Sequence, residues 1–110
     1  MNDCIFCKIV NKEIKSEIVY ENENVIAFKD LNPKAKIHVL IVPKKHFDTI
    51  LDIKDGKIQN DIFLAIQEIA KKYGIDEKGF RIINNCKEDG GQEVMHLHFH
   101  LLGGEKLEIV

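Results

Sequence analysis

The stretch from Met95 to Gly104, near the C-terminal end, constrains this chain most, because in it histidines alternate with large apolar residues. Alternation with a period of two residues is typical of a β-strand, since successive side chains of a strand point to opposite faces. A helix would scatter the same residues around its circumference. The stretch therefore predicts a strand with two unlike faces. The histidines, about 6.5–7 Å apart along the strand, are His96, His98 and His100, and the apolar face is Leu97, Phe99 and Leu101.

Size and charge limit what the chain can be. Its 110 residues are the size of one ordinary domain, and 45% of them are hydrophobic, which is enough for a core. The net charge of −2 shows no basic excess, so we expect no nucleic-acid partner. Local groups must then hold any anionic ligand. We predict a single domain over residues 1–110.

The sequence favours a cytoplasmic location. Its first residues do not resemble a signal peptide, and no apolar stretch approaches the length of a membrane span. We therefore expect no membrane association and a compartment in which thiols stay reduced. The three cysteines are better interpreted as metal ligands or thiols than as disulfides.

The remaining pattern indicates an α+β fold with a largely antiparallel sheet and one long helix. The stretch 37–42 is apolar on both faces, as expected for a central strand. The long helix is predicted over 57–73, with an apolar stripe of Ile62, Phe63, Ile66, Ile69, Ala70 and Tyr73, and with Gly74 after its C-terminal end. The other expected elements are a short helix or turn over 4–12 and strands over 14–20, 25–28, 80–84, the histidine stretch and a final segment to residue 110.

Cys4-x-x-Cys7 is the first motif that could carry chemistry. It does not sit at a strand-to-helix junction of a βαβ pattern, which argues against a redox pair. A closed zinc site needs two more ligands, and His46 and His96 are the candidates. Two idle thiols and a solvated His46 remain alternatives, and spacing alone favours the solvated histidine.

The histidine row is the second motif. A neutral imidazole is both a base and a nucleophile. In a row, the outer histidines can position the middle one and bind anionic oxygens, which makes His98 the candidate nucleophile at phosphorus or a carbonyl. A metal bound by two of the histidines, or histidines hydrogen-bonded in the core, are the alternatives.

Two loops beside the strands suit a nucleotide. The segment Asp89 to Gln92 contains two glycines, which allow the backbone to approach a phosphate, and Gln92 adds an amide donor. Asp30, at the end of a strand, can accept both hydroxyls of a ribose, and Phe28 offers an apolar neighbour. Taken singly, both segments are better explained as ordinary turns.

Together these pieces resemble the histidine triad (HIT) family, and its Hint branch most closely. The central match is the His-x-His-x-His segment followed by two apolar residues, 96–102. The resemblance runs in order over nearly the whole chain. Its other segments are Cys4 to Ile9, Ala27 to Asp30, His38 to His46, Gly90 to Met95, and Gly103 with Gly104.

The resemblance implies a five-stranded antiparallel sheet with a long helix and a short N-terminal helix, paired across a two-fold axis into a homodimer. It implies nucleotide hydrolases or transferases that act on the α-phosphate. By the same resemblance, His98 becomes nucleotidylated and is then hydrolysed, His96 and His100 flank it, and His38 supports the triad by hydrogen bonding.

The resemblance also implies binding residues. Many bacterial members carry structural zinc, which takes no part in the chemistry, on residues matching Cys4, Cys7, His46 and His96. In the nucleotide site, the backbone around Gly91 to Val94 and the side chain of Gln92 would face the phosphate. The residues that match this site are Phe28, Asp30, Leu31, Asn85, Gly91, Gln92 and Val94.

Two departures from the Hint pattern bear on the substrate. Glu93 stands where several Hint proteins have a small hydroxyl residue, and the tail from Glu105 lacks an aromatic ending. We expect a purine nucleoside phosphoramidate hydrolase. The alternatives are a dinucleoside polyphosphate hydrolase of the same family, against which the Leu101 to Gly104 ending argues, and a non-catalytic nucleotide-binding or zinc-stabilised interaction protein.

Overall fold

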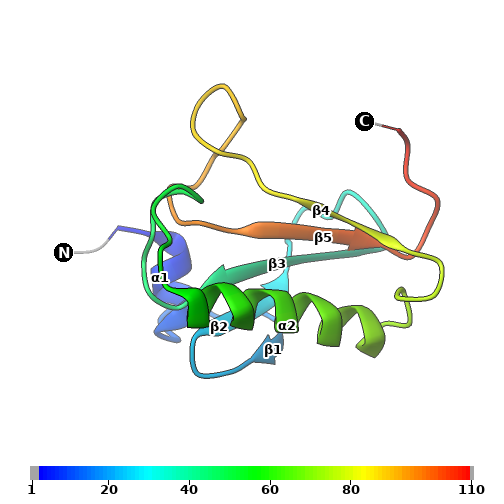
Figure 1. Cartoon of the computed structure of the whole chain (residues 1–110), viewed down its shortest axis with the longest axis horizontal. Coiled ribbons are helices and arrows are strands. Elements are labelled where there is room, and N and C mark those ends of the chain that lie inside the picture. The colour runs from blue at the N-terminus through cyan, green and yellow to red at the C-terminus, as the bar shows by residue number, and fades with distance from the viewer. Residues whose placement is uncertain (1–2, 110) are drawn as a thin grey trace.

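The structure, a computed structural model, describes residues 3–109 and folds them into one five-stranded sheet with two helices (Figure 1). The sheet order is β1-β2-β3-β5-β4, and every neighbouring pair is antiparallel. This confirms the predicted fold class. In chain order the elements are α1 (Ile5–Val10), β1 (Ile18–Glu21), β2 (Val25–Lys29), β3 (Ile37–Pro43), α2 (Gly56–Lys72), β4 (Phe80–Ile83) and β5 (Phe99–Gly103).

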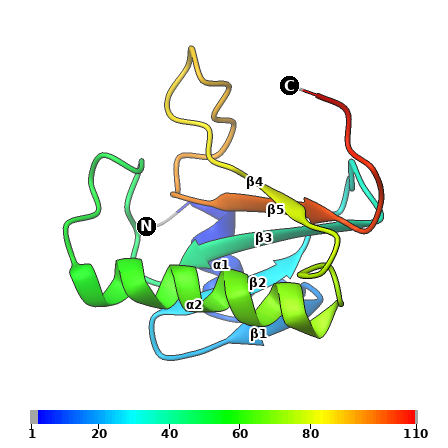
Figure 2. The same ribbon diagram turned by 45° about the vertical axis from the view of Figure 1, so that its right-hand side comes forward.

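The two faces of the sheet bury two separate clusters, as the period of the strands requires. On β3, Val39 and Ile41 point to one cluster and Leu40 and Val42 to the other. Helix α2 lies across the first face (Figure 2), and the short α1 contributes to the second cluster. Because α1 has only six residues, part of the second face stays open.

Local sequence explains the position of α2. The Asp55 carboxylate accepts hydrogen bonds from the backbone N–H groups of Lys57 and Ile58, at 2.9 and 3.2 Å, and so caps the helix. Gly74 adopts a φ of +70° just after the helix, as predicted for a C′ glycine. The predicted stripe is correct except at Phe63, which is 64% exposed, while Ala65 occupies a buried position instead.

Three predicted strands differ from the structure. Strand β1 starts at Ile18 rather than Ile14, because the N–H groups of Glu13 and Ile14 bond to the carbonyl of Lys8. The final strand is absent from the described residues after Gly103, since β5 already has β3 and β4 on its two sides.

The histidine strand is shorter than predicted. Its ladder begins at Phe99, opposite Ile41, and the N–H group of Leu97 bonds to the carbonyl of Phe47 instead of a sheet neighbour. His96 and His98 therefore precede the strand. The alternation of faces still holds, because Leu97 and Leu101 lie in the α2-side core.

Neither helix in the described residues combines the length and the apolar character that a membrane span requires.

Candidate functional site

A hollow of about 480 Å³ opens on the face of the sheet that α1 covers in part. Three of the predicted catalytic residues, His38, His98 and His100, line it. His100 belongs to β5 and pairs with Leu40 of β3, and His38 lies two residues before Leu40, on the same face of β3. The other lining residues are Phe6, Asp30, Asn32, Lys34, Leu40, Ile83, Asn85, Gly91, Glu93, Val94 and Leu102.

His98 is held in one tautomer by the backbone. Its Nδ1 lies 2.8 Å from the carbonyl oxygen of His96, and a carbonyl only accepts, so Nδ1 carries the proton. The other ring nitrogen, Nε2, then keeps its lone pair. The ring of Phe6 meets the imidazole edge-on, with centroids 5.1 Å apart, and fixes its plane. His98 thus presents an oriented imidazole at the wall of the hollow, and the neutral form of such a group can act as a nucleophile.

A second hydrogen-bond chain fixes the protons of the other two histidines. Nδ1 of His38 accepts the backbone N–H of Lys34 at 3.0 Å, so the proton of a neutral His38 must be on Nε2. That Nε2 lies 3.0 Å from Nδ1 of His100 and donates to it. His100 therefore holds its own proton on Nε2 and can donate it to an anionic oxygen.

Burial keeps this pair neutral. It lowers the pKa of His38, an effect that the Asp30 carboxylate opposes and Lys34 reinforces. Burial also lowers the pKa of His100, and the neighbouring His98 and His38 lower it further. Both imidazoles therefore stay uncharged at neutral pH, as the hydrogen-bond chain requires.

Asp30, His38 and His100 also bring three potential metal ligands within 4.8 Å of one another. A metal on Nε2 of His38 would have to replace the proton there. Since Nδ1 already accepts from Lys34, His38 would become an anionic imidazolate. The hydrogen bonds therefore favour a proton-holding pair at this position rather than a metal.

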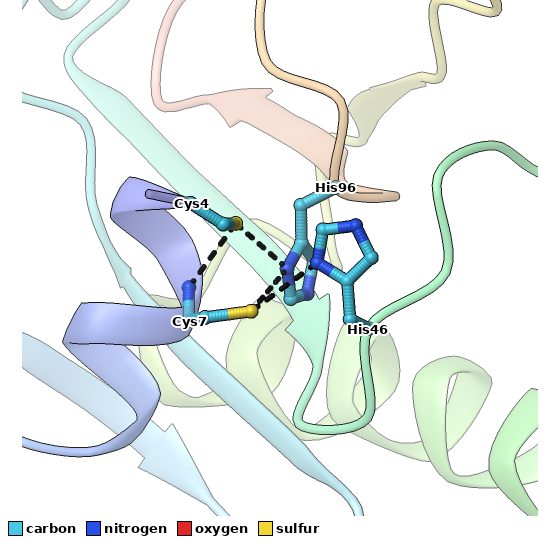
Figure 3. Close-up of side chains that lie close together, drawn as sticks. All are labelled: Cys4, Cys7, His46 and His96. Carbon is cyan, nitrogen blue, oxygen red and sulfur yellow. Dashed lines mark hydrogen bonds between the residues drawn. The ribbon is translucent and has the colours of Figure 1, made fainter. Parts of the chain in front are cut away.

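The second cluster joins the predicted zinc ligands (Figure 3). Cys4 Sγ and Cys7 Sγ lie 3.3 and 3.5 Å from Nδ1 of His96, and Cys7 Sγ lies 3.2 Å from Nδ1 of His46. Zn–S and Zn–N bonds of about 2.3 and 2.0 Å at a tetrahedral angle place S and N about 3.5 Å apart. The four residues therefore fit a closed tetrahedral metal site.

The outer nitrogens of both histidines support this interpretation. Nε2 of His96 lies 2.8 Å from the carbonyl of Pro43, and Nε2 of His46 lies 2.8 Å from the carboxylate of Asp48. Metal-binding histidines usually donate their second N–H to such a group, which turns the first nitrogen toward the ion. Burial also lowers the pKa of His96 to about 4, so its ligand form is present at neutral pH.

His96 thus differs from the prediction that placed it with the catalytic row. Its side chain is completely buried among the cysteines and does not line the hollow. Its carbonyl is connected to the hollow through the hydrogen bond with His98.

Three predicted nucleotide residues also lie outside the hollow. Phe28 is buried against Phe6, and Leu31 is 93% exposed. Gln92 uses its amide on the backbone: it donates to the carbonyls of Asp48 and Val94 and accepts from the N–H of Lys87. It stabilises the loop rather than facing a phosphate.

Backbone N–H groups of this loop also form hydrogen bonds within the loop. The N–H groups of Gly91 and Gln92 donate to the carbonyls of Glu88 and Lys87. Four of the residues predicted to bind the nucleotide do line the hollow: Asp30, Asn85, Gly91 and Val94.

Sequence reasoning missed three residues of the site. Phe6 lies against His98 although 92 positions separate them, and no periodic signal links the two. Lys34 fixes the tautomer of His38 through its backbone, which its side-chain type does not reveal. Asn84 donates to the carbonyl of His98 at 2.9 Å.

Fold and site together define an α+β protein whose histidine-lined hollow adjoins a Cys2His2 cluster. The model of the HIT domain matches residues 11–107, and the chain belongs to the HIT family. A histidine triad protein from Clostridium difficile is 55% identical, with a TM-score of 0.95 over 100% of this chain and 97% of that one.

Two further relatives bear on function. A HIT family hydrolase from Clostridium thermocellum is 46% identical, with a TM-score of 0.95 over 100% of this chain and 97% of that chain. The purine nucleoside phosphoramidase of Escherichia coli is 42% identical over 107 residues, which are 96% of this chain and 90% of that protein.

The lowered pKa of His38 predicts that acidification destabilises the fold. Between pH 7 and 5.5 the unfolded chain gains a proton near its ordinary histidine pKa of about 6.5, whereas folded His38 gains its proton only at a lower pH. The free energy of unfolding should therefore decrease as the pH is lowered, by at most about 1.4 kcal/mol per pH unit for this residue. Urea denaturation across this window measures it.

The variant His38→Gln is the control for this prediction. Its stability should depend less steeply on pH, and the difference between the two slopes isolates His38 from other groups. An equal or steeper slope in the variant would contradict the assignment of a neutral, buried imidazole.

Proposed function

We propose that this chain hydrolyses purine nucleoside phosphoramidates through a nucleotidyl-histidine at His98. The observation that supports this most is the tautomer of His98: Nδ1–H is held by the carbonyl of His96, which leaves the Nε2 lone pair at the hollow. The hydrolase and phosphoramidase names of the relatives agree with this chemistry.

In the first step, Nε2 of His98 attacks the α-phosphorus, the Nε2–P bond forms, and the P–N bond breaks. The leaving amine takes up a proton, and the His38–His100 pair is the proton-holding network beside it. In the second step, the oxygen of water bonds to phosphorus, the Nε2–P bond breaks, and a proton of the water replaces in that network the one that the amine took up. The product is a nucleoside monophosphate.

The His38–His100 pair would also stabilise the charge that develops on the phosphoryl oxygens. Since His38 donates to Nδ1 of His100, the remaining Nε2–H of His100 can donate to such an oxygen. The donor is already oriented before substrate binds, so no reorganisation is needed during the reaction.

The nucleoside would occupy the end of the hollow at Asp30. This carboxylate lines the hollow and can accept the hydroxyls of a ribose, and Leu40 and Leu102 supply apolar surface beside it. Leu31 next to Asp30 is fully available to cover a base.

We also propose that Cys4, Cys7, His46 and His96 hold a structural zinc ion. When bound, the ion would tie the N-terminal helix to the loop after β3 and to the segment before β5. None of the four side chains lines the hollow, which supports a role in folding rather than in the chemical steps.

Two surfaces support the proposed homodimer. Strand β4 is an edge of the sheet, with unpaired backbone groups on its outer side. A separate groove of about 510 Å³ next to α2 is lined by apolar residues including Ile50, Ile53 and Phe63. Covering both by a second copy would remove an open edge and exposed apolar surface.

Replacement of the nucleophile tests the proposed reaction. His98→Ala should lose hydrolysis of an adenosine phosphoramidate by at least about a thousandfold, while circular dichroism and thermal unfolding stay close to those of the parent. Rapid-quench labelling with a radiolabelled substrate should give a labelled protein only when His98 is present. Near-normal turnover by the variant would refute the proposal.

Elemental analysis tests the zinc proposal. The parent should hold about one zinc per chain, Cys7→Ser should hold almost none and unfold at a lower temperature, and Cys86→Ser should resemble the parent. Cys86 is a matched control because it lies outside the Cys2His2 cluster. Equal zinc content in all three proteins would rule out this site.

Sedimentation tests the homodimer. The parent should sediment as a dimer, and Phe63→Glu should shift it toward the monomer because a charge would enter the buried apolar surface. Gln67→Glu adds the same charge at another exposed position of α2 and should remain dimeric. A monomeric parent, or equal behaviour of both variants, would contradict the proposal.

A further inference from the structure

Glu93 places a negative charge in a hollow that is proposed to bind a phosphate ester. It lines the same hollow as His98 and His100, and its negative charge weakly opposes the lowering of the His100 pKa that burial causes. Among residues 3–109 its carboxylate makes no hydrogen bond or ion pair. The charge of Glu93 is therefore not neutralised by any described side chain.

Glu93 and Asp30 lie at opposite ends of the hollow. Asp30 follows β2, and its N–H bonds to the carbonyl of His38, which pairs with Leu102 near the end of β5. Glu93 precedes β5, and Asn85, which also lines the hollow, follows β4. The two connecting loops project from opposite ends of the sheet in both views (Figures 1 and 2). His98 and His100 lie between them.

The positive charge in the lining is found at only one of these ends. Lys34 belongs to the Asp30 loop, and no Lys or Arg from the described residues lines the hollow near Glu93. His38 and His100 are neutral, so they do not offset the carboxylate. The Asp30 end thus has balanced charges, and the Glu93 end is negative.

We infer that Glu93 selects the leaving group of the reaction, favouring neutral or cationic amines and opposing anionic groups. The inference rests on the proposed function, since a nucleoside at the Asp30 end directs the other substituent of phosphorus toward Glu93. A cationic amine is attracted to the carboxylate, and an anionic group is repelled. The same repulsion acts against dinucleoside polyphosphates, whose leaving group is itself a charged nucleotide.

The size of the effect follows from the exposure of Glu93. A charge pair with access to water changes a rate by about threefold for each unit of leaving-group charge, and by about fivefold at most. Between a cationic and an anionic leaving group the difference is two units, so we expect discrimination on the order of tenfold. Because exposed charges are screened, it should shrink as salt is added.

Three adenosine 5′-phosphoramidates of similar size test the inference. Their amines are 2-aminoethylamine, which is cationic, propylamine, which is neutral, and glycine, which is anionic. The measured quantity is the ratio of kcat/KM for the cationic over the anionic substrate. Intrinsic reactivity cancels when this ratio is compared between proteins. In Glu93→Gln the ratio should fall about tenfold from that of the parent.

Glu88→Gln is the matched control, because Glu88 is exposed on the same loop and does not line the hollow. Its ratio should equal that of the parent. An unchanged ratio in Glu93→Gln, or an equal drop in both variants, would overturn the inference. Turnover of the propylamine substrate that depends on His98 would still uphold the proposed function, whereas its absence would overturn both.

Discussion

The structure depends most on the two separate uses of His96. Its imidazole is fully buried and meets the thiols of Cys4 and Cys7, while its backbone carbonyl holds the Nδ1–H of His98. One residue therefore joins the cluster that fixes the N-terminal helix to the group that performs the proposed attack. Any displacement of the cluster moves the carbonyl on which the tautomer of His98 depends.

The two faces of the sheet separate the packing of the core from the side chains of the hollow. The α2 face is a continuous apolar core, and the opposite face carries every histidine of the hollow. Because strand side chains alternate, a core residue and a functional residue can be neighbours in sequence without competing for space. Leu101 beside His100 is an example: the first is fully buried against the α2 side, and the second lines the hollow.

The sequence pattern predicted both helices and all five strands of the sheet, but not their ends, and it added a final strand that the described residues lack. The β3 pattern and the Gly74 stop were correct, because local chemistry decides both. The histidine strand was predicted too long, since the bond from Leu97 to Phe47 is set by a loop distant in sequence. For the same reason Phe6 was missed and Gln92 was given the wrong task. Side-chain type shows what a group can bind, but only the fold shows which partner already occupies it.

The six-residue helix α1 is too short to be stable in isolation, yet together with its N-cap residue Cys4 it supplies two members of the Cys2His2 cluster and the ring that fixes the plane of His98. The beginning of the chain is thus a working part of the site rather than an appendage. For anyone engineering this protein, a fusion or deletion at that end therefore alters the wall of the hollow itself, because Phe6 belongs to its lining.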